Sequence, residues 1–365
     1  MEIRRAIRWA IASVEQELHE NLYIRSRLDR TRPLAVRGLV TRRCNFHCRY
    51  CDFWRHHDHH DELTDREWRD ALMSLRDFLG RYLIQFSGGE PFVRPGFTEL
   101  LTFCRDQGID WGVVTNGSML DPDTARRIVA AQPANIDISV DGITETNHDR
   151  IRGFAGSLDR ITTAISLLRE ERERIGHLFP VRIKATVHRL NFRHLMELVD
   201  WVEDVGATTV DFQAIRPWTA EVESELWIRQ EHDLRELERV VAELVARRRE
   251  GGPIETEDQR MQYWTDHFRG IAGKPSLAPC RVGLRDYHIQ ANGDVHMCWL
   301  YPPIGNVRRA SARELWYGAE AKNQRLQMLT CSRFGSLDCA SSCLNHRTFW
   351  QNVKRGLMIM RRRRA

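Results

Sequence analysis

No apolar run in the 365-residue sequence approaches the ~20 residues that span a bilayer, so no transmembrane helix is expected. The N-terminal apolar stretch from Trp9 to Val14 ends at Glu15 and Glu17, which excludes a secretory signal peptide and favours an amphipathic helix. Neither sign of charge dominates, because 55 basic and 50 acidic residues leave a net charge of only +5. Such a small excess does not by itself indicate a nucleic-acid partner. We therefore expect a cytoplasmic protein with no membrane partner, for which nucleic acid is a disfavoured partner.

The sequence has no repeats and no low-complexity tract apart from Arg361–Arg364, which we interpret as a charged tail. Its nine cysteines are unevenly placed: three lie within eight residues, at Cys44, Cys48 and Cys51, and five follow residue 279. The remaining one, Cys104, is expected to be a small core side chain. Disulfides are not expected, because the cytoplasm keeps thiols reduced. Two groups of thiols far apart in the sequence suggest two metal centres.

Apolar, strand-like runs alternate with helical stretches over the first two thirds of the chain. The runs span residues 34–41, 82–87, 110–116, 135–140, 181–188 and 208–215. Thr64 and Glu67 have the spacing of a capping box and predict the start of a helix. This alternation predicts an α/β fold with a parallel sheet, either a barrel or an open doubly wound sheet. In both folds the chemistry gathers where the strands end.

Changes in composition and in hydrophobic periodicity divide the chain into five parts. They are an N-terminal helical extension (1–33), a core (34–225), a helical linker (226–275), a small cysteine-containing domain (276–347) and a basic tail (348–365). Gly251-Gly252-Pro253 ends a long charged helix in the linker. In the small domain, Asn292-Gly293 predicts a β-hairpin.

The first three cysteines form the pattern C-x3-C-x2-C. Thiolates suit both iron–sulfur clusters and zinc. A structural zinc site or an ordinary [4Fe–4S] cluster takes four protein ligands, but no fourth cysteine is near, so one metal position would stay open, as catalysis requires. A zinc site completed by a histidine is the alternative. The nearby histidines are His47, His56, His57, His59 and His60.

This triplet, with Tyr50 before its last cysteine, resembles the signature of the radical S-adenosylmethionine (SAM) superfamily. Further segments resemble that family in the same order: Ser87–Pro91 with its Gly-Gly-Glu-Pro, Val114–Gly117, Ile138–Gly142 and His148–Arg152. The resemblance covers residues 34–217 and implies a partial (β/α)6 TIM-like barrel. In this family three cysteines hold a [4Fe–4S] cluster and SAM chelates its fourth iron. An electron from a flavodoxin- or ferredoxin-type reductant cleaves SAM to a 5′-deoxyadenosyl radical, which abstracts hydrogen from the substrate.

The resemblance also implies where the methionine part of SAM binds. Gly88 and Gly89 would let the backbone approach it closely, and Glu90 would accept hydrogen bonds from its ammonium group. Ser139 and Arg152 are candidates for binding its carboxylate, Arg152 through a bidentate fork. For Arg152 a surface ion pair is the alternative, and for Ser139 a strand-end cap.

Two further contacts to SAM follow from the same resemblance. Asn116 is a candidate for the methionine or the ribose, and Tyr50 for the adenine. No side chain is assigned to the reaction itself.

The C-terminal cysteines resemble a second feature of this family. Cys280 and Cys298, with Gly293 between them, resemble the opening of the SPASM and Twitch extensions, which carry auxiliary [4Fe–4S] clusters. Cys339 and Cys343 resemble the end of a SPASM domain. A full SPASM domain has more cysteines than these five. We therefore expect one auxiliary cluster, held by Cys280, Cys298, Cys343 and either Cys331 or Cys339, with a zinc site as the alternative.

These features predict a radical SAM enzyme that abstracts hydrogen from a small molecule, namely a sugar, cyclitol, nucleoside or amino acid. A peptide- or protein-modifying maturase is the alternative. The single auxiliary cluster, and a segment 1–33 too short for a leader-binding domain, favour the small molecule, whereas His148–Arg152 favours the maturase. A non-catalytic metal protein that binds nucleic acid through its basic tail is the hypothesis from another class, and it leaves residues 88–91 unexplained.

Overall fold

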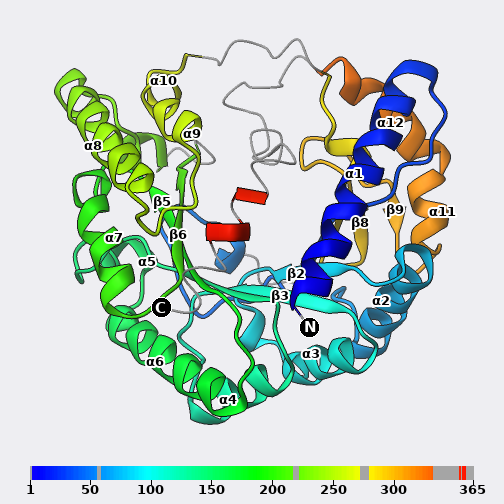
Figure 1. The fold of residues 1–365 in the computed structure, drawn as a ribbon, viewed down its shortest axis with the longest axis horizontal. Helices are drawn as coiled ribbons and strands as arrows, with labels where there is room; N and C mark the ends of the chain where they lie inside the picture. The colour runs from blue at the N-terminus through cyan, green and yellow to red at the C-terminus, as the bar shows by residue number, and fades with distance from the viewer. Residues whose placement is uncertain are drawn as a thin grey trace.

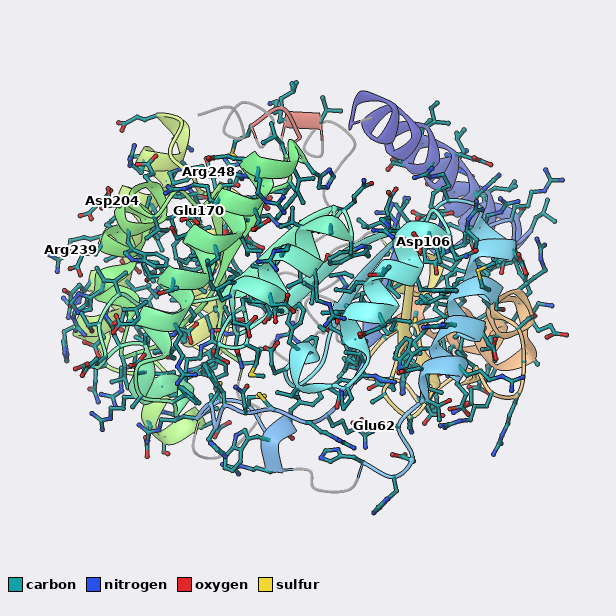
Figure 2. The ribbon with its side chains drawn as sticks, turned by 90° about the horizontal axis from the view of Figure 1, so that it is seen from below. Glu62, Asp106, Glu170, Asp204, Arg239 and Arg248 are labelled. Carbon is teal, nitrogen blue, oxygen red and sulfur yellow. The ribbon has the colours of Figure 1, made fainter. Side chains whose placement is uncertain are left out.

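The computed structural model describes residues 2–55, 59–216, 222–271, 279–331, 353–354 and 356–358. The described strands form one sheet in the order β6-β5-β4-β3-β2-β1-β7-β8-β9. Figure 1 shows this sheet as an open curve, with helices arranged around its outer face. Figure 2 shows the helix layer from below, with Asp106, Glu170 and Asp204 on its exposed side. A partial barrel, and not an open doubly wound sheet, is therefore the fold, as the family resemblance predicted.

The first six strands are parallel to their neighbours throughout. They are β1 (Ala35–Leu39), β2 (Leu83–Ser87), β3 (Asp110–Thr115), β4 (Asn135–Ser139), β5 (Val181–Val187) and β6 (Thr209–Ala214). Each lies inside one of the six apolar runs of the sequence. Parallel pairing brings the carboxyl ends of all six strands to one edge of the sheet.

Helices cross between these strands and then lead into the C-terminal part of the chain. They are α1 (Glu2–Ser26), α2 (Asp65–Leu79), α3 (Phe97–Asp106), α4 (Pro122–Ala130), α5 (Asp149–Arg152), α6 (Ser157–Ile175), α7 (Leu195–Asp204), α8 (Glu231–Arg249), α9 (Asp258–Gln262), α10 (Trp264–Phe268), α11 (Ala312–Tyr317) and α12 (Ala319–Leu329). The predicted capping box begins α2: the Glu67 N–H donates to the Thr64 hydroxyl, and the Thr64 N–H donates to the Glu67 carboxylate. No helix among the described residues is long and apolar enough to cross a membrane.

The two faces of the sheet differ in polarity because strand side chains alternate between them. Residues that point toward the helices are apolar and buried; Phe86 of β2, for example, packs edge-on against Trp68 of α2, with 6.3 Å between ring centroids. The inner face carries charged side chains instead. Asp137 of β4 and Arg182 of β5, which are register partners, form a bidentate ion pair with N···O distances of 2.7 and 2.8 Å.

The C-terminal part continues the same sheet beyond β1. Strand β7 (Asp286–Ile289) pairs parallel with β1, and β8 (Asp294–His296) and β9 (Gly305–Asn306) follow antiparallel. The predicted Asn-Gly hairpin is confirmed between β7 and β8, where Gly293 adopts a φ of 86°. On the same side, the buried Glu20 of α1 forms ion pairs with Arg281 and Arg285. Residues 281–306 are thus joined to both the sheet and the N-terminal helix.

We expect Trp68→Ala to lower the free energy of unfolding by about 3–5 kcal/mol, because it leaves a large cavity between α2 and the sheet. Trp68 is fully buried, and its ring lies 3.2 Å from the position that a side-chain carbon on Gly38 would take. Urea unfolding of the anaerobically purified protein, followed by circular dichroism, measures the change. The half-buried Trp201 of α7 is the matched control, and Trp201→Ala should cost clearly less. Equal losses would contradict this account of the core.

Candidate active site

The three N-terminal cysteines lie on the segment that joins β1 to α2, called here the cysteine loop (residues 40–53). Cys48 is buried, and Cys44 and Cys51 are half-buried. This loop contains no strand, so its backbone groups need partners elsewhere. One partner is Glu62, labelled at the lower edge of Figure 2, whose carboxylate accepts from the Arg42 N–H at 2.8 Å.

The segment after β2 pairs with the cysteine loop through its backbone. The Gly89 N–H donates to the Thr41 carbonyl at 2.9 Å, and the Glu90 N–H donates to the Arg43 carbonyl at 2.8 Å. A side-chain carbon on Gly88 would lie 2.3 Å from the Thr41 oxygen, and one on Gly89 would lie 2.1 Å from the Arg43 oxygen. The close approach that requires these glycines is therefore to the cysteine loop. Their predicted contact with SAM stays a prediction.

Glu90 joins β2 to β3 in the interior. It is fully buried, and its carboxylate accepts from the Thr115 hydroxyl (2.7 Å), the Asn116 N–H (2.7 Å) and the Phe92 N–H (3.1 Å). Burial raises the pKa of Glu90 to about 7, although these three donors act in the opposite direction. One oxygen accepts a single bond from the described residues, so it can still accept from an ammonium group. The predicted role of Glu90 toward SAM is compatible with this geometry and remains a prediction.

Asn116 holds the cysteine loop against the end of β3. Its side-chain amide donates to the Asn45 side-chain oxygen at 2.9 Å, and Asn45 donates in turn to the Ser118 hydroxyl at 2.9 Å. Asn116 is buried, and its side-chain oxygen accepts from Ser118. The observed hydrogen bonds of Asn116 thus hold the cysteine loop, and its contact with SAM stays a prediction.

Arg152 has a partner that neither of our expectations included. Its Nη2 donates to Asp141 Oδ1 at 2.9 Å, and its Nε lies 2.8 Å from Asp141 Oδ2. The ion pair that we considered as the alternative for Arg152 is therefore present, but it is buried and not at the surface. The fork that we assigned to the SAM carboxylate faces Asp141, which leaves Nη1 for that contact. Ser139, the last residue of β4, is half-buried at the same strand end.

The other edge of the cysteine loop is held by the end of α5. The N–H groups of His47 and Arg49 donate to the carbonyls of Arg152 (3.2 Å) and Ile151 (2.9 Å). Gly153 allows this approach: its φ is +66°, and a side-chain carbon there would lie 2.5 Å from the His47 oxygen. The segment 148–152, which we recognised only as a family resemblance, therefore braces the cysteines.

The cysteine thiols are suited to an iron–sulfur cluster. The Phe46 N–H donates to Cys44 Sγ at 3.4 Å, and backbone N–H groups of Asp52 and Phe53 bond Cys51. Such donors stabilise a thiolate that binds metal. Burial raises the pKa of Cys44 to about 11, so its thiolate would need a nearby cation, such as a bound metal, to form at neutral pH. No three His, Cys, Asp or Glu side chains of the described residues meet as the ligands of a zinc ion would, and His56 and His57 of the zinc alternative lie outside those residues. In a [4Fe–4S] cluster each thiolate binds its own iron.

Two buried histidines beside Arg152 support an anionic ligand there. His148 Nδ1 accepts from the Asp141 N–H (3.1 Å) and His188 Nδ1 from the Leu190 N–H (3.2 Å), so each neutral ring carries its proton on Nε2. Burial lowers the pKa of both histidines to about 4. Neither Nε2 atom has a hydrogen-bond partner in the part of the chain that the structure describes. This excess of buried donors fits a carboxylate such as that of SAM.

The structure brings three C-terminal cysteines together around Tyr301. Cys280 and Cys298 are buried, Cys331 is half-buried, and Cys331 shares a hydrogen bond with the Tyr301 hydroxyl. Burial, followed by Cys331, Cys298 and Cys280, raises the pKa of Tyr301 to about 12. This placement is compatible with Cys331 as an auxiliary ligand. Cys339 and Cys343 lie outside the described residues.

Sequence reasoning missed several residues that build the site. They are Asn45, Thr115, Asp141, His148, Gly153, His188 and Tyr301. Asp141 and His148 lie in segments that we recognised, but their type and spacing did not reveal their partners. The only signal for these two in the sequence was that they follow the end of a predicted strand.

Family models match two parts of the chain. The model of the radical SAM superfamily matches residues 39–202, and that of an iron–sulfur cluster-binding domain, SPASM, matches residues 280–344. These are the two segments whose cysteines pointed to separate metal centres.

Three relatives illustrate how far similarity extends. Fe-coproporphyrin III synthase of Methanosarcina barkeri is 30% identical over 174 residues, which cover 47% of this chain and only 41% of that relative. AdoMet-dependent heme synthase of the same organism is 24% identical, with 79% of this chain and 83% of the relative covered. PqqA peptide cyclase of Gluconobacter oxydans is 24% identical, with coverages of 78% and 76%.

Solved structures share the fold. SuiB of Streptococcus suis bound to S-adenosylmethionine superimposes with a TM-score of 0.65 at 17% identity, over 85% of this chain and 71% of SuiB. The structure described as native anSMEcpe with bound AdoMet and Cp18Cys peptide gives a TM-score of 0.60 at 14% identity, over 91% and 96%. At these identities the likeness concerns the architecture.

We expect Gly89→Ala to remove roughly half of the bound iron, because the added carbon would push the Arg43 carbonyl and the adjacent cysteine out of place. Iron and sulfide per chain after anaerobic reconstitution measure the effect. Gly156→Ala is the control: no atom lies within 4 Å of the added carbon, and because Gly156, unlike Gly89, has a positive φ (+71°), this control also includes a backbone penalty that Gly89→Ala lacks. A Gly89→Ala protein with full iron would refute the close contact.

Proposed function

The chain is a radical SAM enzyme with a second, SPASM-type iron–sulfur domain, and we propose that its substrate is a peptide. When bound, SAM and the first cluster supply a 5′-deoxyadenosyl radical that abstracts hydrogen. The relatives matched over most of both chains are named a heme synthase and a PqqA peptide cyclase. The second name supports our peptide alternative, and neither name points to the sugar, cyclitol, nucleoside or amino acid that we expected first.

Cys44, Cys48 and Cys51 would hold the first cluster. The observation that carries this assignment is the backbone pairing of the cysteine loop with the segments that follow β2 and β4. It fixes three thiols at the carboxyl ends of the strands, where this sheet also gathers Glu90, Asn116 and Asp141. Held there by the backbone, the thiols are free to bind iron.

Cys280, Cys298, Cys343 and either Cys331 or Cys339 would hold the auxiliary cluster. Tyr301, the common neighbour of Cys280, Cys298 and Cys331, supports this grouping. We retain residues 34–225 and 276–347 as the two domains, and a flavodoxin- or ferredoxin-type protein as the electron donor.

Cys48→Ala should abolish formation of 5′-deoxyadenosine and remove about half of the iron, because it deletes one thiolate of the first cluster and leaves the auxiliary site intact. The reconstituted enzyme is reduced with dithionite in the presence of SAM, and the product is quantified by chromatography. Cys104→Ala is the matched control, since Cys104 is fully buried in α3 and belongs to neither group. Loss of all iron from the Cys48 variant would exclude two independent sites.

The substrate class is tested by stimulation of SAM cleavage. Pooled synthetic peptides, pooled sugars, nucleosides and amino acids, and a porphyrin panel are each added to the dithionite-reduced enzyme. We expect the peptide pool to raise the rate of 5′-deoxyadenosine formation and to contain a peptide of altered mass. Stimulation by the porphyrin or the small-molecule panel alone would replace the peptide proposal.

A further inference from the structure

Asp141, the second residue after β4, is a carboxylate that links the cysteine loop to α5 and β5. It is fully buried. Its carboxylate accepts from the Tyr50 hydroxyl at 2.6 Å, from Arg152 Nη2 at 2.9 Å and from the Thr186 N–H of β5 at 2.8 Å. Burial is the largest single influence and raises the pKa of Asp141, but Arg152, the two histidines and the Tyr50 hydrogen bond together lower it by more, so the net shift is downward and the group is ionised.

The backbone of Asp141 is held as firmly as its side chain. Its N–H donates to His148 Nδ1 at 3.1 Å, and its carbonyl accepts from the Asn191 side-chain amide at 2.7 Å. The Asn191 amide also donates to the Thr186 carbonyl at 2.8 Å. Asp141 is therefore fixed from β5 and from the segments that follow β4 and β5, and it is a rigid point to which other groups can be attached.

Two groups attached to Asp141 matter for the proposed chemistry. Tyr50 lies between Cys48 and Cys51, so its hydroxyl ties the ligand-bearing part of the cysteine loop to the sheet. Arg152 is the cation that we expect near the SAM carboxylate, and its guanidinium carbon lies 5.4 Å from the centroid of the Tyr50 ring. One carboxylate thus sets both positions.

We propose that Asp141 is a positioning residue. It fixes the distance and orientation of Cys48 and Cys51 relative to Arg152, so that the cluster and the SAM carboxylate can be bound at the same time. Asp141 touches neither group itself and acts through the Tyr50 hydroxyl and the Arg152 guanidinium. This inference rests on the proposed function, since it presupposes that SAM binds beside the cysteine loop.

Asp137 provides a matched control on the same strand. It is also buried, and it forms a bidentate ion pair with Arg182 at 2.7 and 2.8 Å. Among the described residues its partners are Asn135, Arg182 and Lys184, which lie outside the cysteine loop. Asp137→Asn removes the same charge from the same kind of pair, so it reports the general cost of such a loss.

The test compares Tyr50→Phe, Asp141→Asn and Asp137→Asn after anaerobic reconstitution. Three quantities are measured: iron per chain, the dissociation constant for SAM, and the change that SAM causes in the electron paramagnetic resonance spectrum of the reduced cluster. We expect the first two variants to weaken SAM binding roughly tenfold and to alter the spectral change, because each loses a buried hydrogen-bond partner. Asp137→Asn should match wild type in SAM affinity and spectrum.

A double variant, Tyr50→Phe with Asp141→Asn, should weaken SAM binding little more than Asp141→Asn alone, because both act through one contact. Unchanged affinity and spectrum in Tyr50→Phe and Asp141→Asn would overturn the inference, as would equal effects of Asp137→Asn. If Asp141→Asn does not fold, Tyr50→Phe, which keeps the ring and removes only the hydroxyl, decides the question. A wild-type protein that loads iron but binds no SAM would reject the proposed function instead.

Discussion

The site depends on backbone hydrogen bonds between the cysteine loop and the segments around it. The loop forms no strand of its own. Because buried peptide groups without hydrogen bonds are costly, those of the loop form hydrogen bonds with neighbouring segments. The N–H groups of Gly89 and Glu90 donate to it on one side, and the carbonyls of Ile151 and Arg152 accept from it on the other. Because the backbone carries this anchoring, the cysteine side chains remain available as metal ligands. The absence of side chains at residues 88 and 89 is therefore a packing requirement before it is a cofactor requirement.

Parallel strands explain why these neighbours are present. The carboxyl ends of β2, β3 and β4 meet at one edge of the sheet, and each is followed by a polar side chain that turns inward: Glu90, Asn116 and Asp141. Buried carboxylates are tolerated only where donors or cations compensate for lost water. Glu90 is compensated by three hydrogen-bond donors, and Asp141 by Arg152. The same groups that make burial tolerable also link the strand ends to the loop.

The two groups of cysteines lie on segments that are connected to one continuous sheet. Strand β1 leads into the cysteine loop, and its other neighbour, β7, begins six residues after Cys280. The hairpin of β7 and β8 then leads to Cys298, and Glu20 of α1 ties the start of this segment to the N-terminal helix. The candidate auxiliary site thus lies next to strands that continue the barrel sheet. The predicted boundary at residue 276 divides the two groups of cysteines, but the sheet continues across it.

The sequence by itself determined what depends on local patterns: the six parallel strands, the Thr64 capping box, the Asn-Gly hairpin and the C-x3-C-x2-C spacing that indicated iron–sulfur chemistry. Side-chain period, turn chemistry and ligand spacing act over a few residues, so they can be read along the chain. Only the tertiary structure decided the partners. Tyr50 meets Asp141 across 91 residues, and Tyr301 lies near Cys331 as well as near Cys280 and Cys298, which precede it in the chain. Which donor meets which acceptor at the strand ends depends on how the strands are ordered in the sheet, and that order is not encoded in any local segment.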